Sequence, residues 1–263
     1  MWFGAGFDER RAQYFGLRLT GGGTHQSKTL MYKEIFEIIQ RHLDDTADIK
    51  IAVLGENLLG KSTASGRDSA YRNLSSLYGL SSMPPLTQAF LRLADSKPES
   101  LRLSALLVAL CRDPLLRDSA LEVMNATVGA PVQWPALAVR FGVLHPNRFS
   151  EKMLKSMSQN CASTWTQTGH LQGRSKLRTT VHPAPDSVSL AALIATVCGF
   201  SGPAILSSGW LQVLDLTSEG ALDALRAAEG MGLARVRAAG DVVEIAVRAP
   251  LGSALGVPEL EHV

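Results

Sequence analysis

The sequence lacks the residue groupings that several common kinds of site require. Its three cysteines, Cys111, Cys161 and Cys198, are far apart and form no C-x-x-C pair, so neither a zinc ribbon nor a disulfide framework is indicated. No two histidines have the i, i+4 spacing of a helical metal site, and no G-x-S-x-G motif occurs. We therefore expect the cysteines to be small buried residues and predict no catalytic residue, no metal and no cofactor.

Long apolar runs are also missing. The longest, Val188 to Phe200, is too short to span a bilayer. The N-terminus carries Asp8, Glu9, Arg10 and Arg11 after a short apolar start, which does not fit a signal peptide. A reducing cytoplasm and no contact with a membrane are therefore predicted.

Charge is unevenly distributed over a chain of ordinary composition. The 263 residues are 46% hydrophobic and 19% charged with a net charge of +2, which fits one large globular domain or two small ones. Residues 148–182, however, contain six basic residues and a single acid, Glu151. The basic residues are Arg148, Lys152, Lys155, Arg174, Lys176 and Arg178. A local basic patch on a nearly neutral chain predicts an anionic partner for one face.

One short segment matches a motif with a known chemistry. Gly55 to Ser62 fit G-x-x-x-x-G-K-[ST], the P-loop pattern whose backbone N–H groups surround phosphates. The apolar residues 49–54 before it could form the strand that a P-loop requires. Lys61 would then reach the β- and γ-phosphates, and Ser62 would bind Mg²⁺. A P-loop NTPase is therefore one interpretation of this segment.

The rest of the chain favours a different interpretation. A P-loop domain needs a parallel sheet, but after Leu80 the middle of the chain has almost no strand pattern. The Asp that would bind Mg²⁺ after a second apolar strand is also missing. Because a short apolar run cannot be assigned by periodicity alone, residues 49–54 fit the end of a helix as well.

The segment after the motif has the pattern of a short amphipathic helix. Ser65-x-x-Asp68 is typical of a helix start and Gly79 of a helix end. Lys61 and Arg67 would make the N-terminal end of this helix basic, and Arg72 points away from its apolar face. The three basic residues are therefore candidate nucleic-acid ligands, and the alternative is a plain solvated surface.

Several short motifs follow one another in this part of the chain. They are Asn57-Leu58-Leu59, the cluster Ser62-Thr63-Ala64-Ser65 followed by Arg67, and the helix end Leu77-Tyr78-Gly79-Leu80. In this order they resemble the BrxA family of BREX phage-resistance systems, and the similarity extends from Thr20-Gly21-Gly22 to about residue 180. Lys61 departs from the family pattern, which makes the P-loop match incidental. The resemblance implies a non-enzymatic nucleic-acid-binding component that works with other defence-system proteins.

Helical periodicity predominates in the first half of the chain. Helices are predicted over residues 27–43, 101–111 and 114–125. Residues 126–148 contain three prolines and are predicted to form short helical pieces at best. These patterns predict a mainly α protein with winged-helix or helical-bundle modules and small β-hairpins, in which residues 1–125 are an N-terminal helical domain.

Residues 126–185 are predicted to form a helix-turn-strand unit that resembles a winged helix. Ser150 is the expected N-cap, Gly169 the helix end, and residues 175–181 alternate like a strand. The expected buried helix face consists of Leu154, Met157, Cys161 and Trp165. In a winged helix that binds DNA, the helix enters a groove of the duplex and the strands contact the phosphates of its backbone. The candidate contacts are Lys152, Lys155, Arg174, Lys176 and Arg178, unless these residues only solubilise the surface.

Residues 186–250 repeat this order with less charge. Predicted helices over 188–199, 203–214 and 218–231 precede a β-hairpin with its turn at Ala239-Gly240-Asp241. This C-terminal winged-helix-like module suits a protein or a nucleic acid equally well. Residues 251–263 are predicted to be a flexible tail.

Three functions are consistent with these patterns. The first is a non-enzymatic component of a BREX-type bacteriophage defence system that binds double-stranded DNA. The alternative is a protein-interaction scaffold of the same machinery, in which the basic patch meets an acidic partner. The third is a P-loop NTPase that uses Gly55 to Ser62.

Overall fold

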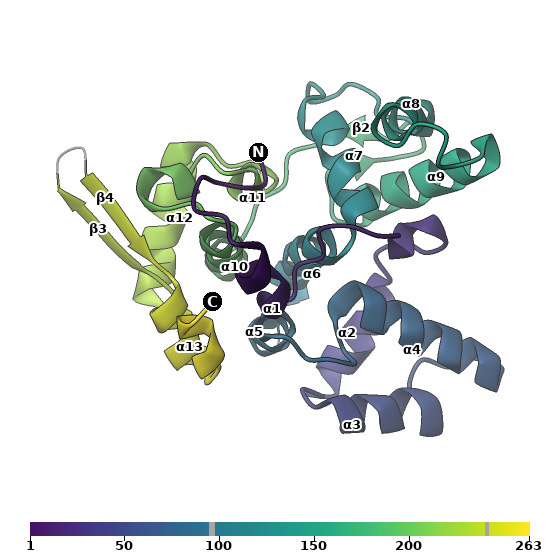
Figure 1. Ribbon diagram of the computed structural model, residues 1–263, viewed down its shortest axis with the longest axis horizontal. Coiled ribbons are helices and arrows are strands. Elements are labelled where there is room, and N and C mark those ends of the chain that lie inside the picture. The colour runs from purple at the N-terminus through teal and green to yellow at the C-terminus, as the bar shows by residue number, and fades with distance from the viewer. Residues whose placement is uncertain (95–97, 240–241) are drawn as a thin grey trace. The chain divides into compact units, whose positions relative to one another are not determined.

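The computed structural model of the protein describes residues 1–94, 98–239 and 242–263. In these residues the chain is mainly helical with two small antiparallel β-hairpins, which confirms the predicted fold class (Figure 1). Packing divides the chain into two compact units. Unit 1 comprises Met1–Leu17, Met83–Leu107 and His182–Val263, and unit 2 comprises Arg18–Ser82 and Val108–Val181. Each unit is therefore assembled from separate stretches of chain, whereas the predicted domains were contiguous.

Unit 2 begins with a group of short helices. They are η1 (Thr24–Gln26), α2 (Tyr32–Gln40), α3 (Thr46–Lys50), the π-helical turn η2 (Ile51–Gly55) and α4 (Ala64–Tyr78). The helix predicted from residue 27 begins only at Tyr32, because Met31 before it has a left-handed backbone with φ 51°. The apolar face of α2 is nevertheless the predicted one, with Ile35, Ile38 and Ile39 buried.

The start of α4 differs from the prediction by two residues. Thr63, and not Ser65, is the N-cap, because the Thr63 hydroxyl accepts the N–H of Gly66 at 3.0 Å. Gly79 ends α4 in a left-handed conformation with φ 78°, as predicted.

The second half of unit 2 contains longer helices and one hairpin. After the end of α6 (Pro98–Arg112) come α7 (Pro114–Met124), α8 (Trp134–Leu144), α9 (Glu151–Gln167), β1 (Leu171–Gln172) and β2 (Leu177–Arg178). The expectation of only short helical pieces between residues 126 and 148 was wrong, since α8 has 11 residues. Pro135 lies in the first turn of α8, where its missing N–H removes no helical hydrogen bond.

Residues 114–178 have the element order of a winged helix, and we call them the α7–β2 module. Between α7 and α8, Pro131 forms an antiparallel bridge with Leu177 of β2. The N–H of Val132 donates to the carbonyl oxygen of Lys176, and that of Arg178 to Ala130, both at 2.9 Å. A short third strand position thus lies beside β2, so the order is helix, strand, helix, helix and two further strands.

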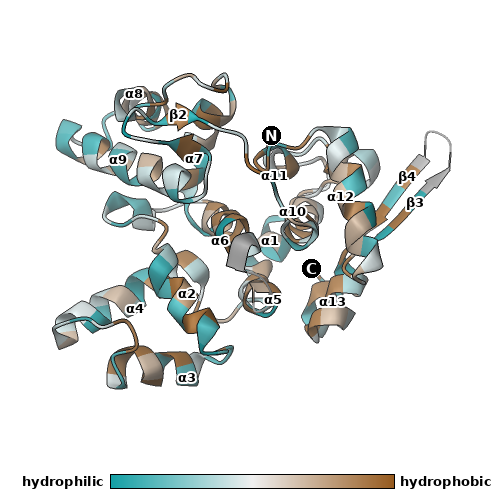
Figure 2. Ribbon diagram, turned by 180° about the vertical axis from the view of Figure 1, so that it is seen from behind, coloured by the Kyte–Doolittle hydropathy of each residue, from teal (hydrophilic) through white to brown (hydrophobic). Residues whose placement is uncertain are grey.

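Unit 1 is built around α10 (Pro185–Val197), nearly all of whose side chains are buried. Its other elements are α1 (Glu9–Phe15), α5 (Pro85–Ala94), the first part of α6, η3 (Gly202–Ile205), α11 (Gly209–Gln212), α12 (Ser218–Gly230), β3 (Arg235–Ala239) and β4 (Val242–Ala246). Hydrophobic and hydrophilic residues both occur along α12, one of whose faces is buried (Figure 2). Helices α10 and α12 and the hairpin follow the prediction, but the helix predicted over 203–214 is divided into the 3-10 turn η3 and the short helix α11. Residues 240–241 of the predicted turn lie outside the described residues.

The prediction of a flexible end was wrong for this structure. Residues 251–263 continue α13 (Arg248–Leu255) and form η4 (Pro258–Glu261), with Leu251, Leu260 and Val263 buried. Gly256, with φ 63°, ends α13 and turns the chain. Gly252, Gly256 and Pro258 interrupt the apolar pattern of this segment and are typical of a loop, so the sequence did not mark these short helices.

A buried histidine–carboxylate pair joins separate segments of unit 2. His25 in η1 and Asp113 before α7 are both buried, and His25 Nδ1 lies 2.7 Å from Asp113 Oδ2. The other ring nitrogen, Nε2, lies 2.8 Å from the hydroxyl oxygen of Thr164 in α9. Asp113 also caps α7, since its Oδ1 accepts the N–H groups of Leu115 and Leu116. The carboxylate therefore connects η1 to α7, and the ring of His25 extends the connection to α9.

The surroundings of Asp113 favour its charged form. Burial alone would raise the pKa of this carboxyl, but the His25 ring and the N–H groups of His25 and Leu116 oppose that effect. The pKa of Asp113 consequently lies below its usual value.

Replacing Asp113 should strongly destabilise unit 2. Asp113→Ala removes a helix cap and leaves His25 buried without its partner, which should cost about 3–5 kcal/mol of unfolding free energy. Because the pKa of Asp113 is lower in the folded chain than its unfolded value of about 3.9, the stabilisation is present above pH ~4 and is lost as the pH falls through the folded-state pKa. Urea unfolding at a series of pH values measures both effects.

Asp68→Ala, at an exposed position of α4, is the matched control. Asp113→Asn should retain much of the shape but lose the acid dependence that Asp113 provides. Equal stability of the Asp113→Ala and Asp68→Ala proteins at neutral pH would contradict the role given to the buried pair.

Candidate nucleic-acid interface

Helix α9 presents a polar face opposite a buried one. Ser150 caps the helix by accepting the N–H of Met153 at 3.3 Å, which confirms the predicted start. Of the four predicted core residues, Met157, Cys161 and Trp165 are fully buried, whereas Leu154 is half-buried. The exposed side chains include Lys152, Lys155, Ser156 and Gln159. This face is therefore available to a partner.

The hairpin β1–β2, which we call the wing, follows α9 directly. Leu171 pairs with Arg178 and Gln172 with Leu177, and residues 173–176 form the turn. Gly173 and Lys176 have positive φ angles of 70° and 54°, as a tight turn requires. Arg174 at the turn is exposed.

Lys176, the second basic residue of the wing turn, connects the wing to α9. Lys176 is half-buried, and its Nζ donates to the hydroxyl of Thr166 in α9 at 3.0 Å. The turn therefore holds both Arg174 and Lys176 beside the helix rather than away from it.

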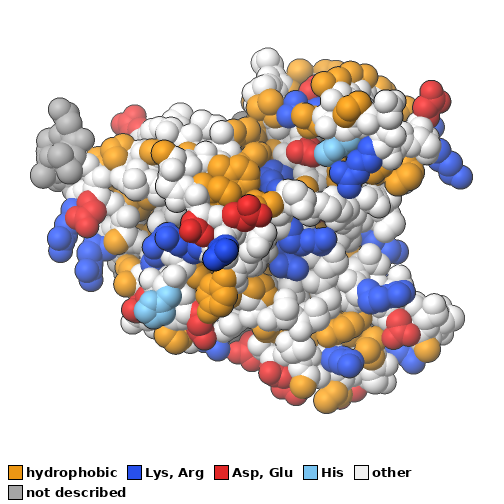
Figure 3. Space-filling model, viewed as in Figure 1, with side chains coloured by type: hydrophobic (Ala, Val, Ile, Leu, Met, Phe, Trp, Pro, Cys, Tyr) orange, Lys and Arg blue, Asp and Glu red, His pale blue; other side chains and the backbone are white. Residues whose placement is uncertain are grey.

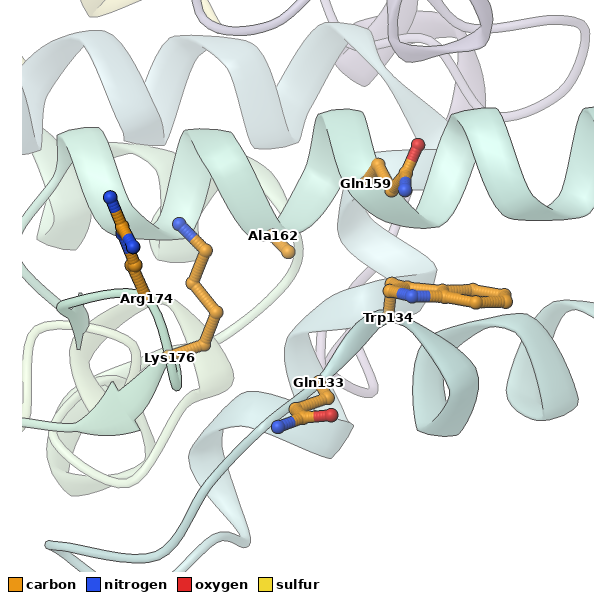
Figure 4. A pocket seen from close by; sticks show the side chains of 6 residues that line it. All are labelled: Gln133, Trp134, Gln159, Ala162, Arg174 and Lys176. Carbon is orange, nitrogen blue, oxygen red and sulfur yellow. The ribbon is translucent and has the colours of Figure 1, made fainter.

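A cavity of about 280 Å³ lies where α9, the wing and the start of α8 meet. Its lining consists of Gln133, Trp134, Gln159, Ala162, Arg174 and Lys176. Figure 4 shows the side chains of Arg174 and Lys176 extending toward α9, while the Trp134 ring points away from them. The cavity thus combines two cations with two amide groups, a set of donors suited to phosphate and polar ligands.

Trp134 separates this cavity from a larger groove between α8 and α9. The groove measures about 650 Å³ and is lined by Trp134, Ala138, Val139, Gly142, Glu151, Lys152, Leu154 and Lys155. Lys155 Nζ lies 5.2 Å from the centroid of the Trp134 ring, within range of a cation–π contact. In Figure 3 hydrophobic side chains gather over α8, close to charged side chains at the end of α9.

Arg178 was wrongly assigned to the interface. Only 4% of this residue is exposed, and its guanidinium donates to the carbonyl oxygens of Val123 and Thr179. Strand alternation placed Arg178 on the same face as Lys176, but β2 has only two residues and Lys176 belongs to the turn. Arg178 therefore stabilises the α7–β2 module from inside.

The P-loop-like segment does not have the structure of a phosphate-binding loop. Residues 49–55 are helical and belong to α3 and η2, so the strand that must precede a P-loop is not formed there. Lys61 Nζ is paired with Glu34 at 3.0 Å, and its N–H donates to Asn57 Oδ1. The segment instead leads into α4.

The remaining predicted residues lie on α4. Arg67 is half-buried and Arg72 is exposed. The structure brings Arg174 and Lys176 together at one cavity and Lys152 and Lys155 at the adjoining groove, whereas Lys61, Arg67 and Arg72 line neither.

Sequence reasoning missed two parts of this region. Trp134 and Gln133 lie beside a proline, in a stretch without helical periodicity, so nothing marked them as part of a cavity wall. The sequence also gave no sign that Asp113, His25 and Thr164 form a carboxylate–imidazole–hydroxyl series. At most 1% of the side chain of His25 or of Asp113 is exposed, and Thr164 is fully buried, which fits a structural role.

Comparisons with known proteins return no match, whether with protein families, curated proteins or solved structures. Within the described residues, no group of three or more His, Cys, Asp or Glu side chains could hold a metal ion. In the same part of the chain, no helix has the length and apolar character needed to cross a membrane.

Lys61→Ala tests the P-loop interpretation. Because Lys61 is held by Glu34, and the two side chains are 33% and 24% exposed, the variant should lose at most about 1 kcal/mol of stability. Any effect of Mg-ATP on thermal unfolding should be the same in the variant, in the wild type and in the control Lys50→Ala. A P-loop would be indicated if saturating Mg-ATP stabilised the wild type by roughly 2.7 kcal/mol at a hundredfold excess over Kd and Lys61→Ala alone abolished the gain.

Proposed function

We propose that the protein binds double-stranded DNA through the α7–β2 module, with α9 in a groove and the wing on the phosphate backbone. The observation that carries the proposal is the placement of Lys152, Lys155 and Arg174, which are exposed on α9 and the wing of a winged-helix order of elements. The resemblance to the BrxA family supports the further proposal of a non-enzymatic role in BREX-type phage defence, together with other proteins of that system.

The charge of the two units favours unit 2 as the part that meets DNA. Unit 2 contains 17 Lys and Arg residues against 11 Asp and Glu, whereas unit 1 contains 9 against 13. The helix of unit 1 that corresponds to α9 in element order is α12, which exposes Glu219, Asp223 and Glu229. Because phosphate contacts dominate affinity for DNA, α9 is the better candidate.

The side chains of α9 also suit a groove. The major groove of B-DNA, about 12 Å wide, admits an α-helix. Lys152 and Lys155 can reach phosphates, and the exposed Gln159 and Ser156 offer hydrogen-bonding groups to base edges. Glu151 in the first turn is the one acid in this stretch, and it opposes phosphate at that end of the helix.

A protein-interaction scaffold is the second candidate, and one observation favours it. Val139 and Val143 of α8 are 68% and 75% exposed and lie on the same helix as the apolar wall of the 650 Å³ groove. Exposed apolar side chains beside a groove are common where a partner protein docks. The lysines at the groove would then pair with acidic residues of that partner.

Removing two exposed charges separates the candidates. Each phosphate contact lowers the slope of log K against log[salt] by about 0.9, so Lys152→Ala combined with Arg174→Ala should flatten the slope by about two units. The affinity for DNA should fall by a similar factor for all duplex sequences, because phosphates carry no base identity. Titrations of labelled duplexes at several salt concentrations measure it.

The pair Arg10→Ala and Arg226→Ala removes the same charge from exposed positions of unit 1 and should leave the slope unchanged. Lys176 and Arg178 are not suitable for this test, since both side chains form internal hydrogen bonds. Full binding with an unaltered slope in the Lys152 and Arg174 double variant would count against the DNA interface and in favour of the scaffold.

A further inference from the structure

A cavity of about 550 Å³ lies in unit 1, remote in sequence from the α7–β2 module. Its walls come from the N-terminal segment, the loop after α10, the end of β4 and the start of α13. Among the lining residues are Arg11, Thr196, Phe200, Ser201, Ile245 and Arg248. The volume falls within the range of roughly 300–1,000 Å³ that is usual for small-molecule sites.

Two arginines face this cavity, and we call it the arginine pocket. Arg248 is half-buried, and its Nε is shielded from solvent without any hydrogen-bond partner. Arg11 is exposed, and within the described residues neither guanidinium forms an ion pair. Burial and the positive charge of Arg11 lower the pKa of Arg248, and no carboxylate opposes them.

The nearest acids on α1 are engaged elsewhere. Asp8 accepts the backbone N–H of Arg11 at 2.8 Å and caps the helix, and Glu9 accepts from the side chain of Gln13 at 2.9 Å. Two like charges thus lie close together at a partly buried site, and no ion pair in the described part of the chain neutralises them. Such an arrangement costs stability unless an anion completes it.

A helix end adds positive potential to the same place. Helix α13 begins at Arg248, and its N-cap, Val247, makes no side-chain hydrogen bond to the first turn. Val247, Arg248 and Ala249 all line the arginine pocket. The partial positive charge of an uncapped helix N-terminus favours anions, particularly phosphate.

In one wall of the arginine pocket, the backbone of the N-terminal segment lies directly against the backbone at Gly199. The N–H of Gly6 donates to the carbonyl oxygen of Gly199 at 3.1 Å. A Cβ at Gly199, which has φ 88°, would lie 2.1 Å from the nitrogen of Phe7, so a side chain cannot be placed there. This contact fixes the segment that leads into α1 and Arg11.

We propose that the arginine pocket binds a small organic phosphate. Arg11, Arg248 and the first turn of α13 receive the phosphate group, and Phe200 and Ile245 contact the organic part. These hydrogen-bond donors come from different elements, so they suit a ligand phosphate, which has three acceptor oxygens, better than a ligand carboxylate, which has two. The proposal does not depend on DNA binding by unit 2.

The test uses phenyl phosphate, inorganic phosphate and phenol on the full chain at constant ionic strength. Thermal unfolding and calorimetric titration should show the highest affinity for phenyl phosphate, a lower one for inorganic phosphate and the lowest for phenol. Only phenyl phosphate supplies both the anion and the apolar group. Arg11→Gln and Arg248→Gln should each weaken phenyl phosphate binding at least tenfold. Arg10→Gln, at an exposed position of the same helix that does not line the cavity, should bind as the wild type does.

A second readout distinguishes a binding site from a structural role. Without ligand, Arg11→Gln should unfold at the same temperature as the wild type or a higher one, since it removes repulsion from Arg248. A lower unfolding temperature, no response to either phosphate, or equal loss in Arg10→Gln would overturn the proposal. It would also be overturned if Arg11→Gln weakened binding of duplex DNA but not of phenyl phosphate, because the arginines would then contact a DNA backbone.

Discussion

The contact between His25 and Asp113 is the interaction on which the arrangement of unit 2 depends. Burying a carboxylate is costly unless partners compensate it, and here the ring of His25 and three backbone N–H groups do so. The chain approaches so closely that a Cβ at Gly23 would lie 1.7 Å from Asp113 Oδ1. Through Thr164 the same contact reaches the last turn of α9. The position of the exposed lysines on α9 is thus set from the buried side of that helix.

The sequence predicted those parts of unit 2 that local chemistry determines. The Ser150 cap, the buried face of α9 and the Gly79 end of α4 all follow from short-range signals, and the structure confirms them. Helix α8 was missed because prolines interrupt the periodic pattern, although Pro135 is compatible with a first turn. The burial of Arg178 could not be predicted, since it depends on the carbonyl oxygen of Val123, which is distant in sequence. Contacts between residues that are distant in sequence form the walls of both cavities, and the hydrophobic periodicity of the sequence does not indicate such contacts.

The two units share an order of elements but differ in the charge of the side chains that the corresponding helices expose. Three helices and a hairpin occur in both, but α9 exposes lysines where α12 exposes Glu219, Asp223 and Glu229. Unit 1 instead has two arginines, Arg11 and Arg248, that form no ion pair in the described part of the chain and line one cavity, and no residue of α12 lines that cavity. A polyanion is recognised by charges spread along a helix and a wing, whereas a small anion needs charges that converge within a cavity. The proposed ligands of the two units differ accordingly.

The interleaving of the units along the chain has a consequence for folding during synthesis. Unit 2 ends at residue 181, so its whole sequence is synthesised before α10 and the rest of the C-terminal part of unit 1. Unit 1 cannot form its core until residues 182–263 have joined Met1–Leu17, a segment that is synthesised before unit 2. Closure of such long loops is slow, and domains generally fold as they emerge. Residues 1–17, with a tryptophan and three phenylalanines, therefore lack their packing partners in unit 1 until the C-terminal part is made, and exposed apolar side chains of this kind favour aggregation.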